Sequence, residues 1–212
     1  MSELTLYYAV PSRGMVVHWM LEELGQPYER KLMDFGAEEH KTPQYLKLNP
    51  MGKVPTLCHG ETVVTETAAI CAYLADAFPE AELAIPVDSP LRGDYYRWLF
   101  FGPVTAETAI LWKALGNVQT EIDYKPFAEV EEVASILESV LQGREYIVGD
   151  HFTAADVIIG STIMWGLRLM PVMPALPGLV RYWENLEKRP AYQRVNAIDQ
   201  KIMADNEEEN LG

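Results

Sequence analysis

The chain has 212 residues, of which 49% are hydrophobic and 23% are charged, as in ordinary globular proteins with a sizeable core. Its formal net charge of −14 disfavours nucleic acids and anionic membrane surfaces, because both bind proteins through clustered lysine and arginine. It has two cysteines, no apolar run near the roughly 20 residues of a membrane span, and no basic segment at its start. We therefore expect a cytoplasmic protein with no nucleic-acid partner, no membrane contact and no signal peptide.

The first 80 residues predict a small α/β domain, because short apolar and β-branched runs alternate with segments of helical period. The order is strand, helix, strand, an irregular stretch, a hairpin and a final helix, which indicates a mixed sheet. The expected elements are strands at 4–10 and 27–33, a hairpin that turns at Gly60 and Glu61, and helices at 15–25 and 67–78.

The rest of the chain predicts an all-helical domain, because its apolar residues recur with helical period. A segment rich in proline and small residues follows Pro79. We expect a first domain at 1–80, a linker at 81–89 and a second domain at 90–212. Pro103 lies inside the first helical segment and predicts a kink there. The expected helical segments are 91–116, 125–143, 153–169, 177–190 and 191–203.

The run FTAADV at 152–157 predicts a capping box at the start of a helix. Thr153 would cap the helix, and Asp156 would return the hydrogen bond three residues later. Phe152 and Val157 would form the accompanying hydrophobic staple. We assign this motif a structural role.

The run NPMGKVPTL at 49–57 places Pro55 at the start of an expected strand, although a proline cannot donate to a sheet ladder. A cis Val54–Pro55 bond would bend the chain and leave the N–H and C=O of Val54 facing outward. These groups could then pair with a peptide-like ligand as an extra strand would. A trans bond at the start of an edge strand is the alternative, and the residues alone leave both open.

NPMGKVPTL followed by ETAAICAYL resembles the N-terminal domain of cytosolic glutathione transferases, and the pair Ser12–Arg13 resembles bacterial and serine-type forms. The resemblance continues through LEELGQPYE, YIVGDHFTAADV and RPAYQR, and covers nearly the whole chain. It implies a thioredoxin-like N-terminal domain followed by a helical bundle. It also implies a cis bond before Pro55, and a role for Val54 in binding the cysteinyl part of glutathione.

The same resemblance implies further binding residues. In similar proteins an acidic residue and a serine at a helix start bind the γ-glutamyl amine and carboxylate, and Glu66 and Thr67 occupy these positions here. A helix N-terminus also favours an anion, although ordinary capping is the alternative role. Similar proteins place basic residues near the glycine carboxylate, for which Lys53 and His40 are the candidates.

A transferase must generate thiolate, because the thiol of glutathione has an ordinary pKa near ~8.5 and thiolate is the nucleophile. Ser12 lies at the expected N-cap of the first helix, as in serine-type transferases, and Tyr7 lies near the end of the first strand, as in tyrosine-type ones. Arg13 would add a positive field near the sulfur. The alternative roles are a simple cap for Ser12, a core aromatic for Tyr7 and a solvated side chain for Arg13.

The main hypothesis is a glutathione S-transferase that conjugates glutathione to a hydrophobic electrophile, in a detoxification role. Glutathione would be the co-substrate, no metal is expected, and the electrophile would lie between the domains against residues 91–116. The resemblance implies a homodimer. Two alternatives remain open: glutathione-dependent disulfide or peroxide reduction or isomerisation, and a transferase-like binding or regulatory module without catalysis.

Overall fold

The computed structural model describes residues 3–116 and 127–211, with side chains as far as Asn206. It divides into two compact units, one of Met1–Ala81 with Arg189–Gly212 and the other of Glu82–Lys188. The end of the chain thus groups with its beginning, whereas the sequence-based domains at 1–80 and 90–212 stay a prediction. Within the described ranges, no helix has the length and apolar character needed to cross a membrane.

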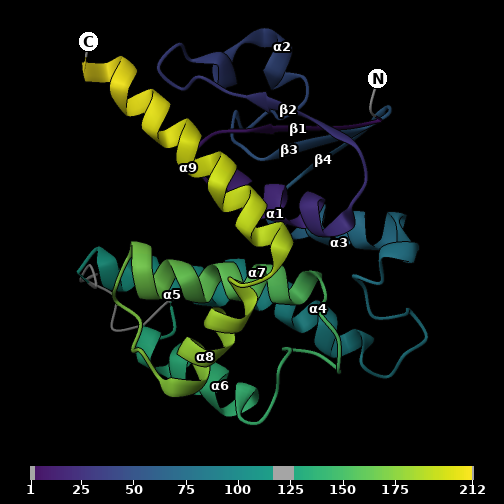
Figure 1. Ribbon diagram of the computed structural model, residues 1–212, viewed down its shortest axis with the longest axis vertical. Helices are drawn as coiled ribbons and strands as arrows, with labels where there is room; N and C mark the ends of the chain where they lie inside the picture. The colour runs from purple at the N-terminus through teal and green to yellow at the C-terminus, as the bar shows by residue number, and fades with distance from the viewer. Residues whose placement is uncertain (1–2, 117–126, 212) are drawn as a thin grey trace. The chain divides into compact units, whose positions relative to one another are not determined.

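The first unit contains a four-stranded mixed sheet in the order β2-β1-β3-β4 (Figure 1). β2 pairs in parallel with β1, whereas β3 pairs antiparallel with β1 and with β4. The predicted mixed sheet and its hairpin turn at Gly60 and Glu61 are confirmed. The strands are β1 (Leu4–Tyr8), β2 (Tyr28–Leu32), β3 (Thr56–His59) and β4 (Thr62–Thr65).

Helices cover both faces of this sheet, with α2 on one side and α1 and α3 on the other (Figure 1). Successive residues of a strand point to opposite faces, so the last two residues of β1 separate. Tyr7 lies toward Tyr45 of α2, and Tyr8 lies toward His18 of α1. The helical elements of this unit are α1 (Gly14–Leu24), the short 3-10 turn η1 (Glu39–Lys41), α2 (Pro43–Leu46), α3 (Thr67–Ala77), the 3-10 turn η2 (Pro79–Ala81) and α9 (Pro190–Leu211).

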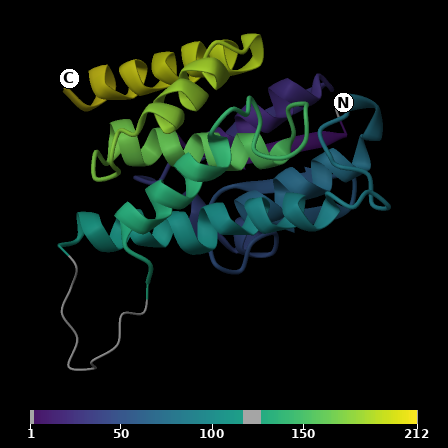
Figure 2. The ribbon, with the colours of Figure 1, turned by 90° about the horizontal axis from the view of Figure 1, so that it is seen from below.

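The second unit is helical, as predicted. Its first expected helix, 91–116, contains a π-helical segment around Pro103 (η3) between two α-helices, and Figure 2 shows this run as a nearly continuous teal helix. Proline lacks the N–H that the helix ladder needs, which is consistent with the local change of register, and the kink at Pro103 stays a prediction. The elements are α4 (Arg92–Phe100), η3 (Phe101–Ala106), α5 (Glu107–Ala114), α6 (Val130–Leu141), α7 (Ala154–Met164), the π-helical η4 (Trp165–Leu169) and α8 (Pro177–Leu186).

The helix expected at 125–143 begins later than predicted. Residues 125 and 126 lie outside the described ranges, and α6 starts only at Val130. Glu129 is the N-cap and forms a capping box with Glu132. This box was not predicted, because Glu is not among the preferred N-cap residues.

The capping box at Thr153 and Asp156 is confirmed. Asp156 is fully buried, and its Oδ2 accepts the backbone N–H of Thr153 at 2.8 Å. Its Oδ1 accepts the N–H of Ile147 at 2.8 Å and the hydroxyl of Tyr182 at 2.7 Å. Asp156 therefore joins the start of α7 to the preceding loop and to α8, which is more than a cap requires.

We predict that Asp156→Ala lowers the free energy of unfolding by about 2–4 kcal/mol, because it leaves several buried donors without an acceptor. Asp150→Ala is the matched control, since the Asp150 side chain is fully exposed and should change stability by less than about 0.5 kcal/mol. Urea unfolding of both variants measures the difference. Equal stabilities for the two variants would show that Asp156 does not stabilise the second unit.

Candidate functional site

The turn before β3 presents main-chain groups of Val54 that the sheet does not use. The Val54–Pro55 bond is cis, as predicted, and β3 begins only at Thr56, opposite Tyr7. Among the residues that the structure describes, none hydrogen-bonds to the N–H or the C=O of Val54. Val54 is half-buried, so an extended peptide could pair with it as an added strand would.

The inner side of the same turn is firmly held. Lys53 C=O accepts hydrogen bonds from the Tyr45 hydroxyl at 2.5 Å and from Asn49 Nδ2 at 2.8 Å. Asn49 Oδ1 in turn accepts the N–H of Met51 at 3.1 Å. Burial raises the pKa of Tyr45, so its phenol stays a neutral donor. The turn is therefore held in place on its inner side, whereas the main-chain N–H and C=O of Val54 are left unpaired.

A lysine that the sequence analysis did not single out lies beside this turn. Lys41 Nζ is 3.4 Å from the carbonyl oxygens of both Met51 and Gly52. His40 precedes it in η1, with its ring 4.4 Å from that of Phe35, and the Lys53 side chain is exposed. The run EHK at 39–41 was the available signal, because it places a second basic residue directly after His40.

Glu66 occupies an unusual backbone position at the start of α3. Its φ is 70°, which side chains other than glycine rarely adopt. Its C=O accepts the N–H of Ile70 at 2.9 Å, but within the described part of the chain its exposed side chain makes no capping bond. The capping role considered for Glu66 is thus not seen. Its carboxylate and the first N–H groups of α3, beginning at Thr67, remain available to a ligand.

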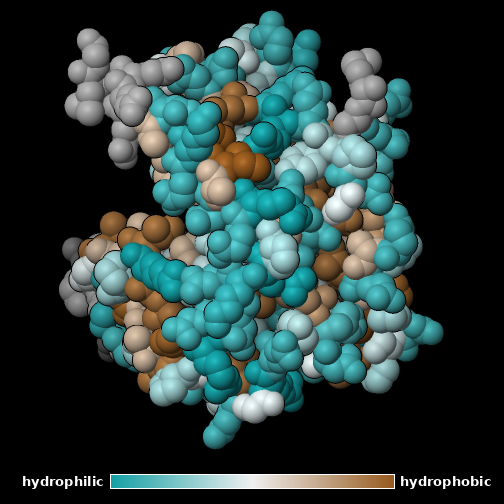
Figure 3. All heavy atoms as spheres, in the orientation of Figure 1, coloured by the Kyte–Doolittle hydropathy of each residue, from teal (hydrophilic) through white to brown (hydrophobic). Residues whose placement is uncertain are grey.

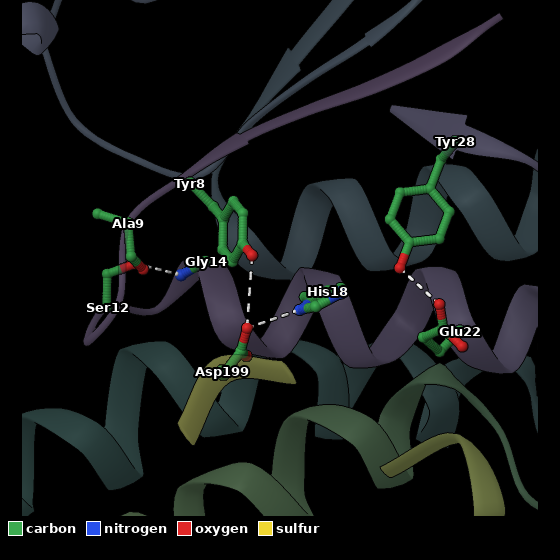
Figure 4. A network of polar contacts seen from close by, with 8 residues as sticks. All are labelled: Tyr8, Ala9, Ser12, Gly14, His18, Glu22, Tyr28 and Asp199. Atoms are coloured by element: carbon green, nitrogen blue, oxygen red, sulfur yellow. Dashed lines mark hydrogen bonds and ion pairs between the residues drawn. The ribbon is translucent and has the colours of Figure 1, made fainter. Parts of the chain in front are cut away.

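Ser12 is not the N-cap of α1, which is Arg13. The Ser12 hydroxyl instead donates to Ala9 C=O at 2.6 Å, and its Oγ accepts the N–H of Gly14 at 2.9 Å (Figure 4). Ser12 thus links the end of β1 to the start of α1. It lies one residue before the N-cap instead of at the N-cap, where it was predicted. A second cis bond, Val10–Pro11, which the sequence analysis did not predict, lies in the same loop.

The start of α1 packs directly on the end of β1. A Cβ at Gly14 would lie 2.6 Å from Tyr8 Cβ and 2.9 Å from Ser12 Oγ, closer than real contacts allow. Glycine is therefore required at position 14. Arg13, half-buried at this helix start, lies near Cys71 of α3: burial raises the pKa of Cys71 to about 12, and the Arg13 charge opposes that shift.

Tyr7 and the loop that precedes Ser12 line different cavities. Tyr7 lines one of about 610 Å³ together with Lys31 and Tyr45, and its hydroxyl accepts a hydrogen bond from Lys31 Nζ at 3.3 Å. The loop before Ser12, from Ala9 to Pro11, lines another of about 640 Å³. The two cavities share Leu32 and Met33 in their lining, and Tyr7 lines only the first of them.

The cavity beside the Ser12 loop has a lining of mixed character. Residues 32–36, which include Asp34 as well as Leu32 and Phe35, form one wall, and Asn206 of α9 contributes to the lining. Leu32 is 44% exposed and Phe35 is 45% exposed, and Figure 3 shows hydrophobic side chains at the surface of the first unit. The cavity therefore offers apolar surface close to the start of α1.

Comparisons of the sequence with known proteins point to one protein family. The chain matches the glutathione S-transferase N-terminal domain over residues 2–76 and the glutathione S-transferase C-terminal domain over residues 106–190. It is 33% identical to glutathione S-transferase 1 of Schizosaccharomyces pombe over 158 residues, which are 68% of this chain and 66% of that protein. It is 27% identical to glutathione S-transferase 1 of Zea mays, over 93% of this chain and 98% of that protein.

A solved structure gives the same result. Glutathione transferase URE2P8 from Phanerochaete chrysosporium, crystallised with oxidized glutathione, is 27% identical to this chain with a TM-score of 0.77. The similarity covers 96% of this chain and 98% of that protein. The first unit thus has the thioredoxin-like fold that the resemblance implied. With both of its domain models matched over most of its length, the chain belongs to the glutathione S-transferase family.

Proposed function

We propose that this chain is a glutathione S-transferase that binds glutathione in its first unit and directs the thiolate at a hydrophobic electrophile. The observation that carries the proposal is the unpaired main chain of Val54, next to Pro55 in a turn that is fixed on its inner side. The cysteinyl residue of glutathione can form two backbone hydrogen bonds there, as an added strand does. Membership of the glutathione S-transferase family favours glutathione as the peptide-like ligand of this turn.

The γ-glutamyl end of glutathione would bind at the start of α3. The Glu66 carboxylate would accept from the α-amine, while the Thr67 hydroxyl and the first N–H groups of α3 would hold the α-carboxylate. The positive φ of Glu66 supports this role, because strained backbone persists chiefly where function requires it. Thr67 retains the hydroxyl that the serine of similar proteins provides.

The glycine carboxylate would lie near three basic side chains, those of Lys41, His40 and Lys53. Lys41 is the best placed, because its ammonium group already lies against the carbonyl groups of Met51 and Gly52. A local positive group matters on a chain of net charge −14, since glutathione is itself an anion. We therefore add Lys41 to the binding residues that the sequence analysis named.

Ser12 would stabilise the thiolate. Its single hydroxyl proton now points to Ala9 C=O, so it must turn toward the sulfur at the cost of that hydrogen bond, about 1 kcal/mol. The start of α1 and the Arg13 charge favour the same anion. The thiol proton leaves to solvent. The sulfur then donates an electron pair to the electrophilic carbon, a C–S bond forms, and a leaving group such as halide departs with its bonding electrons.

The electrophile would be apolar, because the cavity beside the Ser12 loop exposes Leu32 and Phe35. The relatives described above are transferases by name, which favours conjugation over reduction, isomerisation or a non-catalytic role. A cytoplasmic, reducing location fits the two cysteines, Cys58 and Cys71, which are both free.

A homodimer is also part of the proposal. Tyr96, Phe100 and Val104 are spaced four residues apart along α4 and η3, and their exposed fractions are 41%, 58% and 65%. Large apolar side chains exposed in a row indicate a surface that another protein covers. For a member of this family, a second copy of the chain is the partner that we propose.

For thiol activation, we predict that Ser12→Ala raises the pKa of bound glutathione by about one unit or more. A hydrogen bond to a charged group contributes about 1.5–3 kcal/mol, and one pKa unit corresponds to about 1.4 kcal/mol. Tyr7→Phe should leave that pKa unchanged. Thiolate absorbance in the ultraviolet, followed against pH, measures both variants. The opposite pattern would transfer the role to Tyr7.

For the γ-glutamyl end, Glu66→Ala and Glu66→Gly should both weaken glutathione binding by roughly tenfold or more, because each removes a charge-assisted hydrogen bond. Glycine tolerates the positive φ of this position, so only Glu66→Gly should unfold at a temperature equal to or above that of the unmodified protein. Calorimetric titration and thermal melting separate the two effects. Unchanged affinity in Glu66→Ala would remove Glu66 from the site.

For assembly, we predict that Phe100→Glu converts the dimer to monomers, because it places a charge in the apolar row. Leu169→Glu is the matched control, since Leu169 is 64% exposed in η4 and should leave the dimer intact. Sedimentation velocity gives the molecular mass of each species. A monomeric unmodified protein, or a Phe100→Glu variant that remains dimeric, would contradict the assignment.

A further inference from the structure

A buried polar network links the C-terminal helix α9 to the end of β1 and to α1. Asp199 of α9 and His18 of α1 are both fully buried. Asp199 Oδ1 lies 3.0 Å from His18 Nδ1 and accepts the Tyr8 hydroxyl at 3.4 Å (Figure 4). All three residues belong to the first unit, so a segment near the end of the chain contacts the first strand through a carboxylate.

This carboxylate depends on its two neighbours. Asp199 Oδ2 and His18 Nε2 are buried, and neither has a hydrogen-bond partner among the described residues. Burial raises the pKa of Tyr8, and the Asp199 charge raises it further, so the phenol remains a neutral donor. A buried carboxylate is costly unless it is hydrogen-bonded. The contacts with Tyr8 and His18 therefore offset the cost of burying the Asp199 carboxylate.

Tyr8 is directly connected to the loop that carries Ser12. It is the last residue of β1, and the carbonyl group of the next residue, Ala9, accepts the Ser12 hydroxyl. Its Cβ also faces Gly14 at the start of α1, at a spacing that excludes any larger residue. A displacement of Tyr8 would therefore move both the hydroxyl and the helix start that are proposed to face the sulfur.

The docking of α9 on α1 has separate anchors that do not involve Tyr8. Arg189 pairs with Glu23 at 2.7 Å and Arg194 with Glu22 at 2.8 Å. The rings of Trp19 and Tyr192 meet edge to face at 5.0 Å. The two ion pairs lie at the last turn of α1, whereas His18 is nearer to the Ser12 loop. The anchors can thus hold the helix while Asp199 acts on Tyr8.

We infer that Asp199 is a positioning residue, which holds Tyr8 and through it the segment Ala9–Gly14 in the arrangement that presents Ser12 to the thiol of glutathione. The inference rests on the proposed role of Ser12. Asp199 itself touches neither glutathione nor the reacting atoms. Its effect should therefore fall on thiolate formation and turnover, and hardly on the binding of the tripeptide at Val54 and Glu66.

The experiment compares Asp199→Ala with Asp199→Asn, Tyr8→Phe and the control Arg194→Ala in the full chain. Asp199→Ala should raise the pKa of the bound thiol and lower kcat about tenfold or more, since small misplacements of a reacting group are costly. The KM for glutathione should change less than about threefold, because Val54 and Glu66 are untouched. Asp199→Asn keeps an acceptor oxygen and should restore most of the activity.

The remaining variants separate positioning from general stability. Tyr8→Phe removes the hydroxyl and with it the hydrogen bonds to Asp199 and Arg30, so it should reproduce part of the Asp199→Ala effect even if that variant folds poorly. Arg194→Ala breaks an exposed anchor of the same helix and should leave the thiol pKa and kcat unchanged. Equal effects of Arg194→Ala and Asp199→Ala would overturn the inference, as would an unchanged thiol pKa in both Asp199→Ala and Tyr8→Phe.

Amide hydrogen exchange of residues 9–16 gives a readout that does not need glutathione. Exchange there should be faster in Asp199→Ala than in Arg194→Ala, because only the first variant releases Tyr8. If the unmodified protein fails to form a glutathione thiolate, the proposed function fails. The exchange measurement still decides whether Asp199 orders the loop, and equal protection in the two variants would show that it does not.

Discussion

The arrangement of the proposed site depends on one constraint, the exclusion of Val54 from the sheet. β3 begins at Thr56, Pro55 has no N–H to contribute, and Tyr45 and Asn49 hold the turn from its inner side. The free main-chain groups therefore occupy a fixed position. A peptide that pairs with them is placed between the start of α3 and the basic side chain of Lys41, which suits the charges at the two ends of glutathione.

Side chains along β1 alternate between the two faces of the sheet, so Tyr7 and Tyr8 have different roles. Tyr7 points to the α2 face, where it contacts Lys31 and Tyr45. Tyr8 points to the face covered by α1 and contacts Asp199 of α9. The tyrosine that the resemblance suggested for the thiol thus lies away from the Ser12 loop, whereas its neighbour supports that loop. In this unit the last helix is part of the framework that positions the proposed chemistry.

Local patterns predicted most of the fold. The order of elements along the first unit, the turn at Gly60 and the capping box at Asp156 follow from neighbouring residues, and the family resemblance correctly implied the cis bond before Pro55. Two features escaped because they depend on contacts distant in sequence. The run EHK signals basic residues, but the contact with Gly52 is what distinguishes Lys41 from His40, and the Asp199–His18 contact joins helices from opposite ends of the chain. The N-cap of α1 was misplaced by one residue, because a hydroxyl can bond the helix start from just outside it.

A crystal structure of this protein with bound glutathione would show whether the main chain of Val54 pairs with the ligand. We expect the cysteinyl N–H and C=O of the tripeptide to form hydrogen bonds with the C=O and N–H of Val54, with the sulfur near Ser12 at the start of α1. Glutathione bound elsewhere, for example in the cavity beside Tyr7 and Lys31, with the main chain of Val54 left unpaired, would contradict this expectation.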